Sequence, residues 1–264
     1  GLLDPACGPG AFLTTAVPLL RDALLAQGWT PGAVLAHLQE RVVGLDTHPA
    51  AVAVARTAYL LALGELALGP RPNVTLPVYL ADPLLPPEAQ PPPVGDEPSY
   101  RLAFASLPFP LELPRGVVLQ PAVADRVFDA FRRYLVGYVA LSPDETRFLH
   151  AFGSFLKHHR DVGPFLSDAA IGALVGAMTA LRRLYRDGRD TVWLSLLRGG
   201  ARPAALREQG FDVVVGAPPW LPLRRVAEPH RAARLRRLAV EPGLAPPEPQ
   251  HPAAEVELAA LAFA

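Results

Sequence analysis

Short apolar runs alternate with longer segments of helical spacing in the first third of the chain. Runs at residues 2–3, 41–45 and 76–81 have the length and apolar character of buried strands. Between and after them, apolar residues recur every three to four positions, which predicts helices. These helices are expected at residues 11–27, 31–39 and 49–63. The apolar face of the first helix is expected to comprise Phe12, Ala16, Leu19, Leu20, Ala23 and Leu24.

Beyond residue 83 the pattern is mostly helical until one more strand follows. Residues 83–98 are rich in proline and predict an exposed loop. Residues 100–107 and 115–119 are predicted to pair as a small hairpin. The β-branched run at residues 211–215 predicts a buried strand that ends at a glycine and two prolines. Further helices are expected at residues 122–138, 143–160, 165–186 and 229–240, with a loop at 242–252 and the start of a helix at 255–264.

The order of these elements predicts an α/β fold. Strands that alternate with helices favour a parallel sheet with helices on both faces. We divide the chain into residues 1–83, which hold the first three strands, a long and mostly helical insertion at 84–210, and a final strand with its following helices at 211–264. In parallel sheets of this kind, ligands bind at the carboxyl ends of the strands.

Composition limits the classes of function. The 264 residues suffice for one large or two small domains, and 25 basic residues balance 25 acidic ones. Domains that bind nucleic acids are usually basic, so any surface that binds nucleic acid is expected to be local or to lie outside this chain. Cys7 is the one cysteine, which excludes a disulfide framework or a cysteine-rich zinc site within the chain. No secretory signal opens the sequence and no apolar run reaches the ~18 residues that span a bilayer, so a cytoplasmic location is expected.

A glycine turn follows the first predicted strand. Gly8 and Gly10 let the backbone bend tightly and approach a ligand closely. The free N–H groups of the helix that begins near Ala11 suit an anionic group. A dinucleotide site of the Gly-x-Gly-x-x-Gly type would have a third glycine where Leu13 stands. An ordinary turn between strand and helix is the alternative.

Carboxylates follow the second and third predicted strands. Asp46 is placed to accept hydrogen bonds from ribose hydroxyls, or else to cap the helix that begins at Pro49. Asp82 is placed to accept a hydrogen bond from an adenine amino group, or else to form a turn before Pro83.

The fourth strand leads into Ala217-Pro218-Pro219-Trp220. Two prolines fix the backbone, and a carbonyl between them can accept a hydrogen bond from an exocyclic amine. Trp220 can stack on a flat base. In the alternative interpretation, the loop is merely rigid and Trp220 fills a gap in the core.

Together these segments resemble the N6-adenine DNA methyltransferases of restriction–modification systems. Residues 4–12 match the first motif of that family, with Pro9 where serine is usual. Residues 43–49 are similar to the second motif, with His48 where aspartate is common, and residues 80–83 look like the third. Residues 211–220 match the fourth motif, Asn-Pro-Pro followed by an aromatic residue, except that Ala217 replaces the asparagine.

The resemblance implies a Rossmann-like fold, S-adenosylmethionine (SAM) as the cofactor, and double-stranded DNA with a flipped adenine as the target. It implies that Asp4, Ala6, Gly8 and Gly10 surround the methionine part of SAM, that Asp46 binds the ribose, and that Thr47, Asp82 and Pro83 contact the adenine. It also implies that Pro218 accepts a hydrogen bond from the target N6, with Pro219 beside it and Trp220 stacked on the base.

Two departures from the family's pattern qualify this picture. Ala217 cannot accept a hydrogen bond from the target amine, so we expect impaired or absent transfer. A further segment that contacts SAM is expected before Gly1, and a recognition domain after Ala264, so the chain is interpreted as part of a longer protein. Restriction or other defence subunits are possible partners. The alternatives are a non-catalytic module that binds SAM, and a protein glutamine methyltransferase.

The roles of two further features are left open by the sequence. The neighbouring His158 and His159 point in different directions on a helix, which favours a surface pair over a metal site. The arginines of the helix at 229–240 could contact phosphates or form a solvated face. They are Arg231, Arg234, Arg236 and Arg237.

Overall fold

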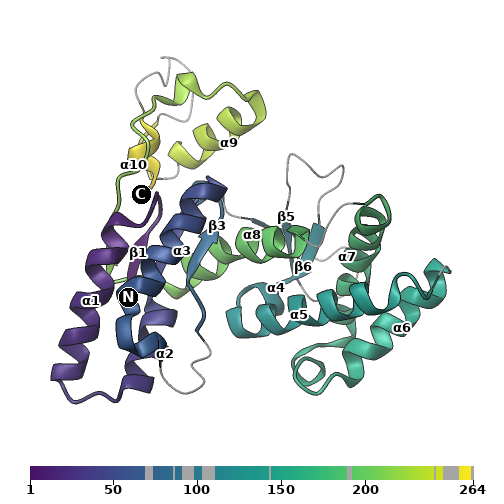
Figure 1. The fold of residues 1–264 in the computed structure, drawn as a ribbon. Coiled ribbons are helices and arrows are strands. Elements are labelled where there is room, and N and C mark those ends of the chain that lie inside the picture. The colour runs from purple at the N-terminus through teal and green to yellow at the C-terminus, as the bar shows by residue number, and fades with distance from the viewer. Residues whose placement is uncertain are drawn as a thin grey trace. The chain divides into compact units, whose positions relative to one another are not determined.

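The computed structural model contains two compact units (Figure 1). The first comprises Gly1–Leu85 and Gly210–Ala264, and the second Pro86–Gln209. The second unit lies within the stretch 84–210, for which a helical insertion is expected. The structure describes residues 1–68, 74–85, 87–90, 98–102, 111–142, 144–188, 192–240, 242–245 and 256–262.

A four-stranded parallel sheet organises the first unit, in the order β3-β2-β1-β7. Asp4 lies opposite Gly44 on the neighbouring strand, and Asp46 lies opposite Leu80. The α/β class and the parallel sheet expected from the sequence are therefore present. The strands are β1 (Leu2–Asp4), β2 (Val42–Asp46), β3 (Val78–Leu80) and β7 (Val213–Val214).

Three helices pack on one another and on this sheet: α1 (Ala11–Ala26), α2 (Pro31–Arg41) and α3 (Pro49–Leu63), which continues into the 3-10 turn η1 (Gly64–Ala67). The hydroxyl of Thr30 accepts the N–H of Ala33 and so begins α2. The buried hydroxyl of Tyr59 on α3 donates to the carbonyl of Leu38 on α2 over 2.8 Å. These contacts join the helices around one hydrophobic core.

The buried face of α1 is only in part the expected one, since Leu20 and Leu24 pack against the core as predicted but the face is centred on other residues. Leu13 and Val17 are fully buried, whereas Phe12 is 41% and Leu19 66% exposed. The cause lies on β2, where a Cβ at Gly44 would stand 2.7 Å from the Leu13 side chain. Because glycine leaves this space free, Leu13 fills it, and its position sets the rotation of the helix.

One segment of the described residues, Pro49–Ala67, has the length and apolar composition of a membrane span. This is weak evidence for a membrane, since core helices pass the same test. On α3 the side chains of Val52, Tyr59 and Leu63 belong to the hydrophobic core.

The strand expected at residues 211–215 is shorter and more exposed than predicted. It forms β7, at the edge of the described sheet, where Val213 is 50% and Val214 44% exposed. The expectation of a buried strand is therefore wrong, because β7 pairs with β1 on one side and is the last strand of the order.

Short elements follow β7 and pack on the chain segment after β3. Residues 221–223 and 256–258 run antiparallel, with hydrogen bonds from Leu223 N to Val256 O (2.8 Å) and from Leu258 N to Leu221 O (3.0 Å). The elements are η3 (Leu223–Arg225), α9 (Pro229–Val240) and α10 (Leu258–Ala262). Their shared hydrophobic cluster is made of Leu84, Leu223, Leu235 and Leu258.

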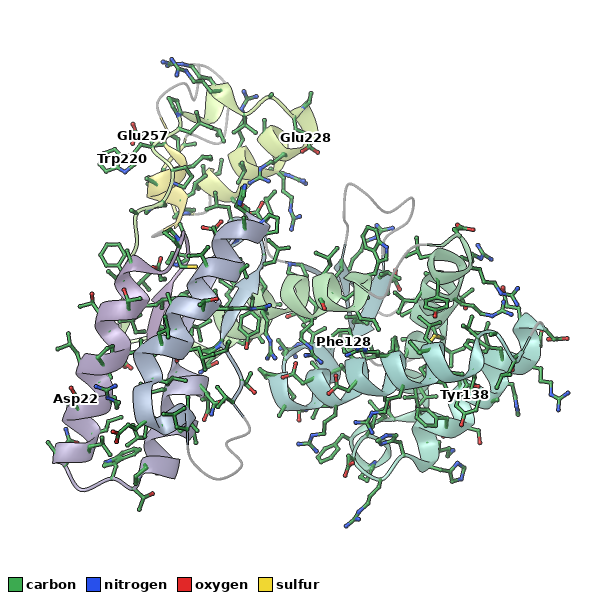
Figure 2. All side chains as sticks on the ribbon, in the orientation of Figure 1. Asp22, Phe128, Tyr138, Trp220, Glu228 and Glu257 are labelled. Carbon is green, nitrogen blue, oxygen red and sulfur yellow. The ribbon has the colours of Figure 1, made fainter. Side chains whose placement is uncertain are left out.

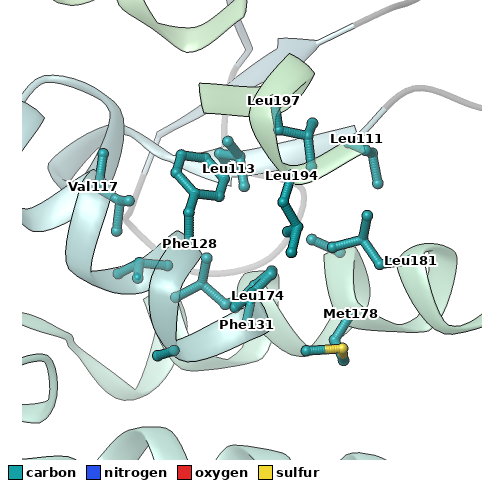
Figure 3. Close-up of a cluster of buried hydrophobic side chains, with 14 of the residues drawn as sticks. Leu111, Leu113, Val117, Phe128, Phe131, Leu174, Met178, Leu181, Leu194 and Leu197 are labelled. Carbon is teal, nitrogen blue, oxygen red and sulfur yellow. The ribbon is translucent and has the colours of Figure 1, made fainter. Parts of the chain in front are cut away.

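The second unit combines a three-stranded antiparallel sheet with helices around its own core (Figure 3). The strands are β4 (Glu88–Gln90), β5 (Ser99–Leu102) and β6 (Leu111–Pro114). The helices are α4 (Arg115–Val118), α5 (Pro121–Tyr138), α6 (Glu145–His158), α7 (Asp168–Arg186) and α8 (Val192–Gln209), with the 3-10 turn η2 (Gly163–Phe165).

Two predictions for this unit are wrong, and one of its helices was not predicted individually. The hairpin partner of β5 is residues 111–114, while 115–118 begin the helical part. β4 lies inside the stretch predicted to be a loop, of which residues 86 and 91–97 lie outside the described residues. That helix is the long α8.

Candidate functional site

Residues from four strands meet at one edge of the sheet, because all four strands run parallel. Asp4 and Asp46 are the last residues of β1 and β2, and Asp82 follows β3 by two residues. The backbone N–H of Ala81 donates to the carbonyl of Asp46 over 3.0 Å, so the chain after β3 stays beside β2. Val215 N–H donates to Leu3 O over 2.9 Å, which brings the end of β7 to the same edge.

The glycine turn after β1 is held by backbone hydrogen bonds. Cys7 N–H donates to Leu45 O over 2.9 Å, and Gly10 N–H donates to Cys7 O over 2.8 Å. Gly8 and Gly10 have φ values of +53° and +94°, which favour glycine. A Cβ at Gly10 would lie 3.2 Å from Ala55, so this glycine also lets α1 and α3 approach each other. A Cβ at Gly8 would meet nothing within 4 Å, so the turn has open space there.

Asp46 ties this turn to the end of β2. Its Oδ2 accepts the N–H of Gly8 and its Oδ1 accepts the N–H of His48, both over 2.8 Å. Each carboxylate oxygen has a second lone pair, which can accept a ribose hydroxyl. Asp46 does not cap α3: His48 does, since its Nδ1 accepts the N–H of Ala51 over 3.4 Å. Thr47, between them, is exposed.

Asp4 is a fully buried carboxylate with one unsatisfied oxygen. Its Oδ1 accepts the N–H of Ala6 over 3.2 Å, while Oδ2 has no hydrogen-bond partner among the described residues. Burial raises the pKa of Asp4 to about 6, the hydrogen bond from Ala6 lowers it, and the charge of Asp46 raises it. An uncompensated buried carboxylate costs free energy, so this oxygen suits a cation or a hydrogen-bond donor brought by a ligand.

The loop after β7 passes directly against this carboxylate. A Cβ at Gly216 would lie 2.7 Å from Asp4 Oδ1, so only glycine fits there without a shift. Gly216 therefore sets the distance between the Asp4 carboxylate and the segment that begins at Ala217.

The segment Ala217–Trp220 presents its aromatic residue to the outside. Pro218 is buried, whereas Ala217, Pro219 and Trp220 are exposed, Trp220 to 80%. Figure 2 shows the indole of Trp220 standing clear of the ribbon. The interpretation in which Trp220 fills a core gap is therefore wrong, and the side chain is free to stack on a flat partner.

Asp82 takes part in both a turn and an ion pair. Its Oδ1 accepts the N–H of Leu84 over 3.1 Å, which is the expected turn interaction. Its Oδ2 lies 2.8 Å from Nη2 of Arg231 on α9. The sequence marks Arg231 as part of a basic cluster, but nothing in it indicates this partner. Pro83, beside Asp82, is half-buried.

Among the described residues, the neighbouring histidines and the cysteine do not form a reactive or metal-binding site. Nδ1 of His158 is 2.8 Å from Ser154 O, and Nδ1 of His159 accepts the N–H of Asp161 over 3.3 Å. In the described part of the chain, no three His, Cys, Asp or Glu side chains gather in a way that could hold a metal ion. Burial, and then the charges of Asp4 and Asp46, raise the pKa of the Cys7 thiol to about 12, so it is a poor nucleophile.

The residues at the sheet edge fit SAM chemically. Asp4 suits its ammonium group, the open turn at Gly8 leaves room for its methionine part, and α1 begins without a side-chain cap. Comparison with known protein families, with curated proteins and with solved structures finds no match for this chain.

Proposed function

We propose that the chain is the catalytic core of a SAM-dependent methyltransferase that acts on the N6 amino group of adenine in double-stranded DNA, in the cytoplasm, and whose rate is reduced by Ala217. The observation that carries the proposal is the unsatisfied buried oxygen of Asp4, beside a glycine turn and at the same edge as Asp46, Asp82 and the Pro218–Pro219 loop. The strand order β3-β2-β1-β7 supports a Rossmann-like methyltransferase fold, for which restriction or defence subunits are the proposed partners.

On the cofactor side, each residue has a distinct task. When bound, SAM supplies an electrophilic methyl group. Asp4 holds the ammonium group, and the free N–H groups at the start of α1 hold the carboxylate of the methionine part. Asp46 accepts the ribose hydroxyls, and Asp82 accepts the adenine amino group. Ala6, Gly8 and Gly10 form the turn that surrounds the methionine part, and Thr47 and Pro83 border the adenine.

On the target side, the proline loop orients the base. Trp220 stacks on the flipped adenine, and the ring of Pro218 is buried, which fixes its carbonyl as an acceptor for the N6 amino group. Pro219 keeps the loop rigid. The side chain of Ala217 provides no second acceptor, and the loss of one hydrogen bond aimed at the reacting group costs a factor of ~10²–10³ in rate.

The test combines binding with transfer. Isothermal titration of the chain with SAM is expected to give binding that Asp46→Ala weakens. Transfer of labelled methyl groups to adenine-containing duplex DNA is expected to rise ~10²-fold or more in Ala217→Asn. Ala217→Ser, which adds a hydroxyl of smaller reach, is the matched control. No SAM binding at millimolar concentration would overturn the proposal. Robust methyl transfer by the unchanged protein would overturn the claim that Ala217 reduces the rate.

A second candidate is a module that binds SAM without transferring its methyl group. Ala217 favours it, because an exposed alanine occupies the position where the family has its catalytic asparagine. SAM binding together with no transfer by either the unchanged chain or Ala217→Asn would support this module over the enzyme.

A further inference from the structure

We infer that Arg231 on α9 belongs to the cofactor site and donates a hydrogen bond to N1 of the adenine whose amino group Asp82 accepts. This inference rests on the proposed function, in which Asp82 binds the N6 amino group of the cofactor. The ion pair between Asp82 and Arg231 then acts as one unit that recognises two neighbouring atoms of the purine.

Asp82 can accept a ligand although both of its oxygens are engaged. Oδ1 accepts the N–H of Leu84 over 3.1 Å, and Oδ2 lies 2.8 Å from Nη2 of Arg231. Each carboxylate oxygen has a second lone pair, so an amino group can bind while both contacts remain. Because the two contacts hold the plane of the carboxylate, they set the direction of its remaining lone pairs before a ligand arrives.

Arg231 likewise keeps donors for a ligand. A guanidinium group carries five N–H donors in one plane, and the ion pair with Asp82 engages one of its nitrogens, Nη2. The side chains of Arg231 and Asp82 are 33% and 21% exposed, so a ligand can reach both. The pair therefore offers an acceptor and a donor side by side.

This arrangement of acceptor and donor is complementary to adenine. On the Watson–Crick edge of the base, the N6 amino group donates and N1 accepts. Both nitrogens are bonded to the same carbon, whereas N7 lies one atom further from the amino group. Two side-chain groups that are in direct contact with each other therefore suit N6 and N1 better than N6 and N7.

A hydrophobic cluster fixes the helix of Arg231 beside Asp82. Leu235, one helical turn beyond Arg231, is fully buried and clusters with Leu223 and with Leu84, which lies two residues after Asp82. This packing keeps the donor next to the acceptor in the ligand-free protein. A ligand therefore meets a site that is already ordered, which lowers the cost of binding.

The experiment measures the affinity of the chain for S-adenosylhomocysteine and two analogues by isothermal titration. In the 1-deaza analogue a C–H replaces N1, and in the 7-deaza analogue, the matched control ligand, a C–H replaces N7. A hydrogen bond from a charged donor contributes about 10-fold or more to binding, so the unchanged protein should bind the 1-deaza analogue about 10-fold more weakly. It should bind the 7-deaza analogue almost as well as S-adenosylhomocysteine.

Two variants assign this difference to one side chain. Arg231→Met removes the donors and keeps a long apolar stem, so it should bind S-adenosylhomocysteine and the 1-deaza analogue with equal, weakened affinity. Arg236→Met makes the same substitution at an exposed position of α9 and should keep the preference of the unchanged protein. If Arg231 merely held Asp82 in place, Arg231→Met would weaken both ligands by the same factor and leave that preference intact.

The outcomes separate this inference from the proposed function. Equal binding of S-adenosylhomocysteine and the 1-deaza analogue by the unchanged protein would overturn the inference alone, as would an intact preference in Arg231→Met. A loss of affinity with the 7-deaza analogue in place of the 1-deaza analogue would also overturn it. No binding of S-adenosylhomocysteine at millimolar concentration would overturn the proposed function, and the inference with it.

Discussion

The backbone N–H of Gly8 donates to Oδ2 of Asp46 over 2.8 Å and so joins the turn after β1 to the end of β2. The other oxygen of Asp46 accepts the N–H of His48, which in turn caps α3. The shape of the turn and the orientation of the carboxylate therefore depend on each other. The side chain of Asp46 therefore supports both the glycine turn and the residue that caps α3.

Asp46→Ala is expected to destabilise the protein by about 1–3 kcal/mol, because two backbone N–H groups lose their acceptor. Asp46→Asn should cost less, since its amide oxygen still accepts one of them. Urea unfolding followed by circular dichroism measures both. Asp22→Asn, at an exposed carboxylate, should stay within about 0.5 kcal/mol of the unchanged protein. Equal stability of Asp46→Ala and the unchanged protein would show that these hydrogen bonds are not formed in solution.

Gly216→Ala is expected to destabilise the protein by about 1–3 kcal/mol, because its Cβ would stand 2.7 Å from Asp4 Oδ1 and force the loop outward. Gly172→Ala is the matched control. A Cβ at Gly172, on the exposed side of α7, would meet nothing within 4 Å, and alanine there should add about 0.5–1 kcal/mol of stability. Thermal unfolding measures the stability of the two variants. A Gly216→Ala protein as stable as the unchanged protein would contradict the close contact between Gly216 and Asp4.

Local signals in the sequence sufficed for helices with clear starts. The bounds expected for α3 and α9, residues 49–63 and 229–240, are those observed, since each helix begins at a proline. The signals failed for α8, where Gly199, Gly200 and Pro203 all argue against a helix. Packing of Leu194 and Leu197 into the core of the second unit outweighs that local preference (Figure 3).

For the candidate site, the alternation of strands and helices was enough to bring Asp4, Asp46, Asp82 and the proline loop to one edge. The pairing of Asp82 with Arg231 could not be predicted from the sequence, because it depends on the packing of α9, which is far from Asp82 along the chain. The unsatisfied oxygen of Asp4 was equally hidden, since a sequence does not reveal which buried polar atoms lack partners.

Tyr59→Phe is expected to lower the free energy of unfolding by about 0.5–1.5 kcal/mol, because the hydroxyl loses a buried hydrogen bond to Leu38 O. The cost stays modest because this carbonyl also accepts the backbone N–H of Val42. Tyr138→Phe, at a half-exposed tyrosine, should have almost no effect. Chemical denaturation of the three proteins compares them, and similar losses in both variants would argue against a specific link between α2 and α3.

Asp4→Asn is expected to stabilise the ligand-free protein at pH 7 by about 1–2 kcal/mol while weakening SAM binding. The native pKa of Asp4 is about 6, above its ordinary value of 3.8, so between these values the folded protein holds more protons than the unfolded chain. Stability therefore falls as the pH rises from 4 to 6 and then levels off. Removing the carboxylate removes that fall, so the gain from Asp4→Asn should vanish near pH 4.

Urea unfolding at pH 4, 5, 6, 7 and 8 measures the stability of each protein. Asp22→Asn is the control and should keep the fall in stability between pH 4 and 6, because Arg21 holds the pKa of Asp22 below its usual value. Two results would contradict this prediction: an Asp4→Asn protein that is less stable than the unchanged protein at pH 8, or one that keeps the fall in stability between pH 4 and 6. Either would mean that the charge of Asp4 is compensated within the folded protein and needs no cationic ligand.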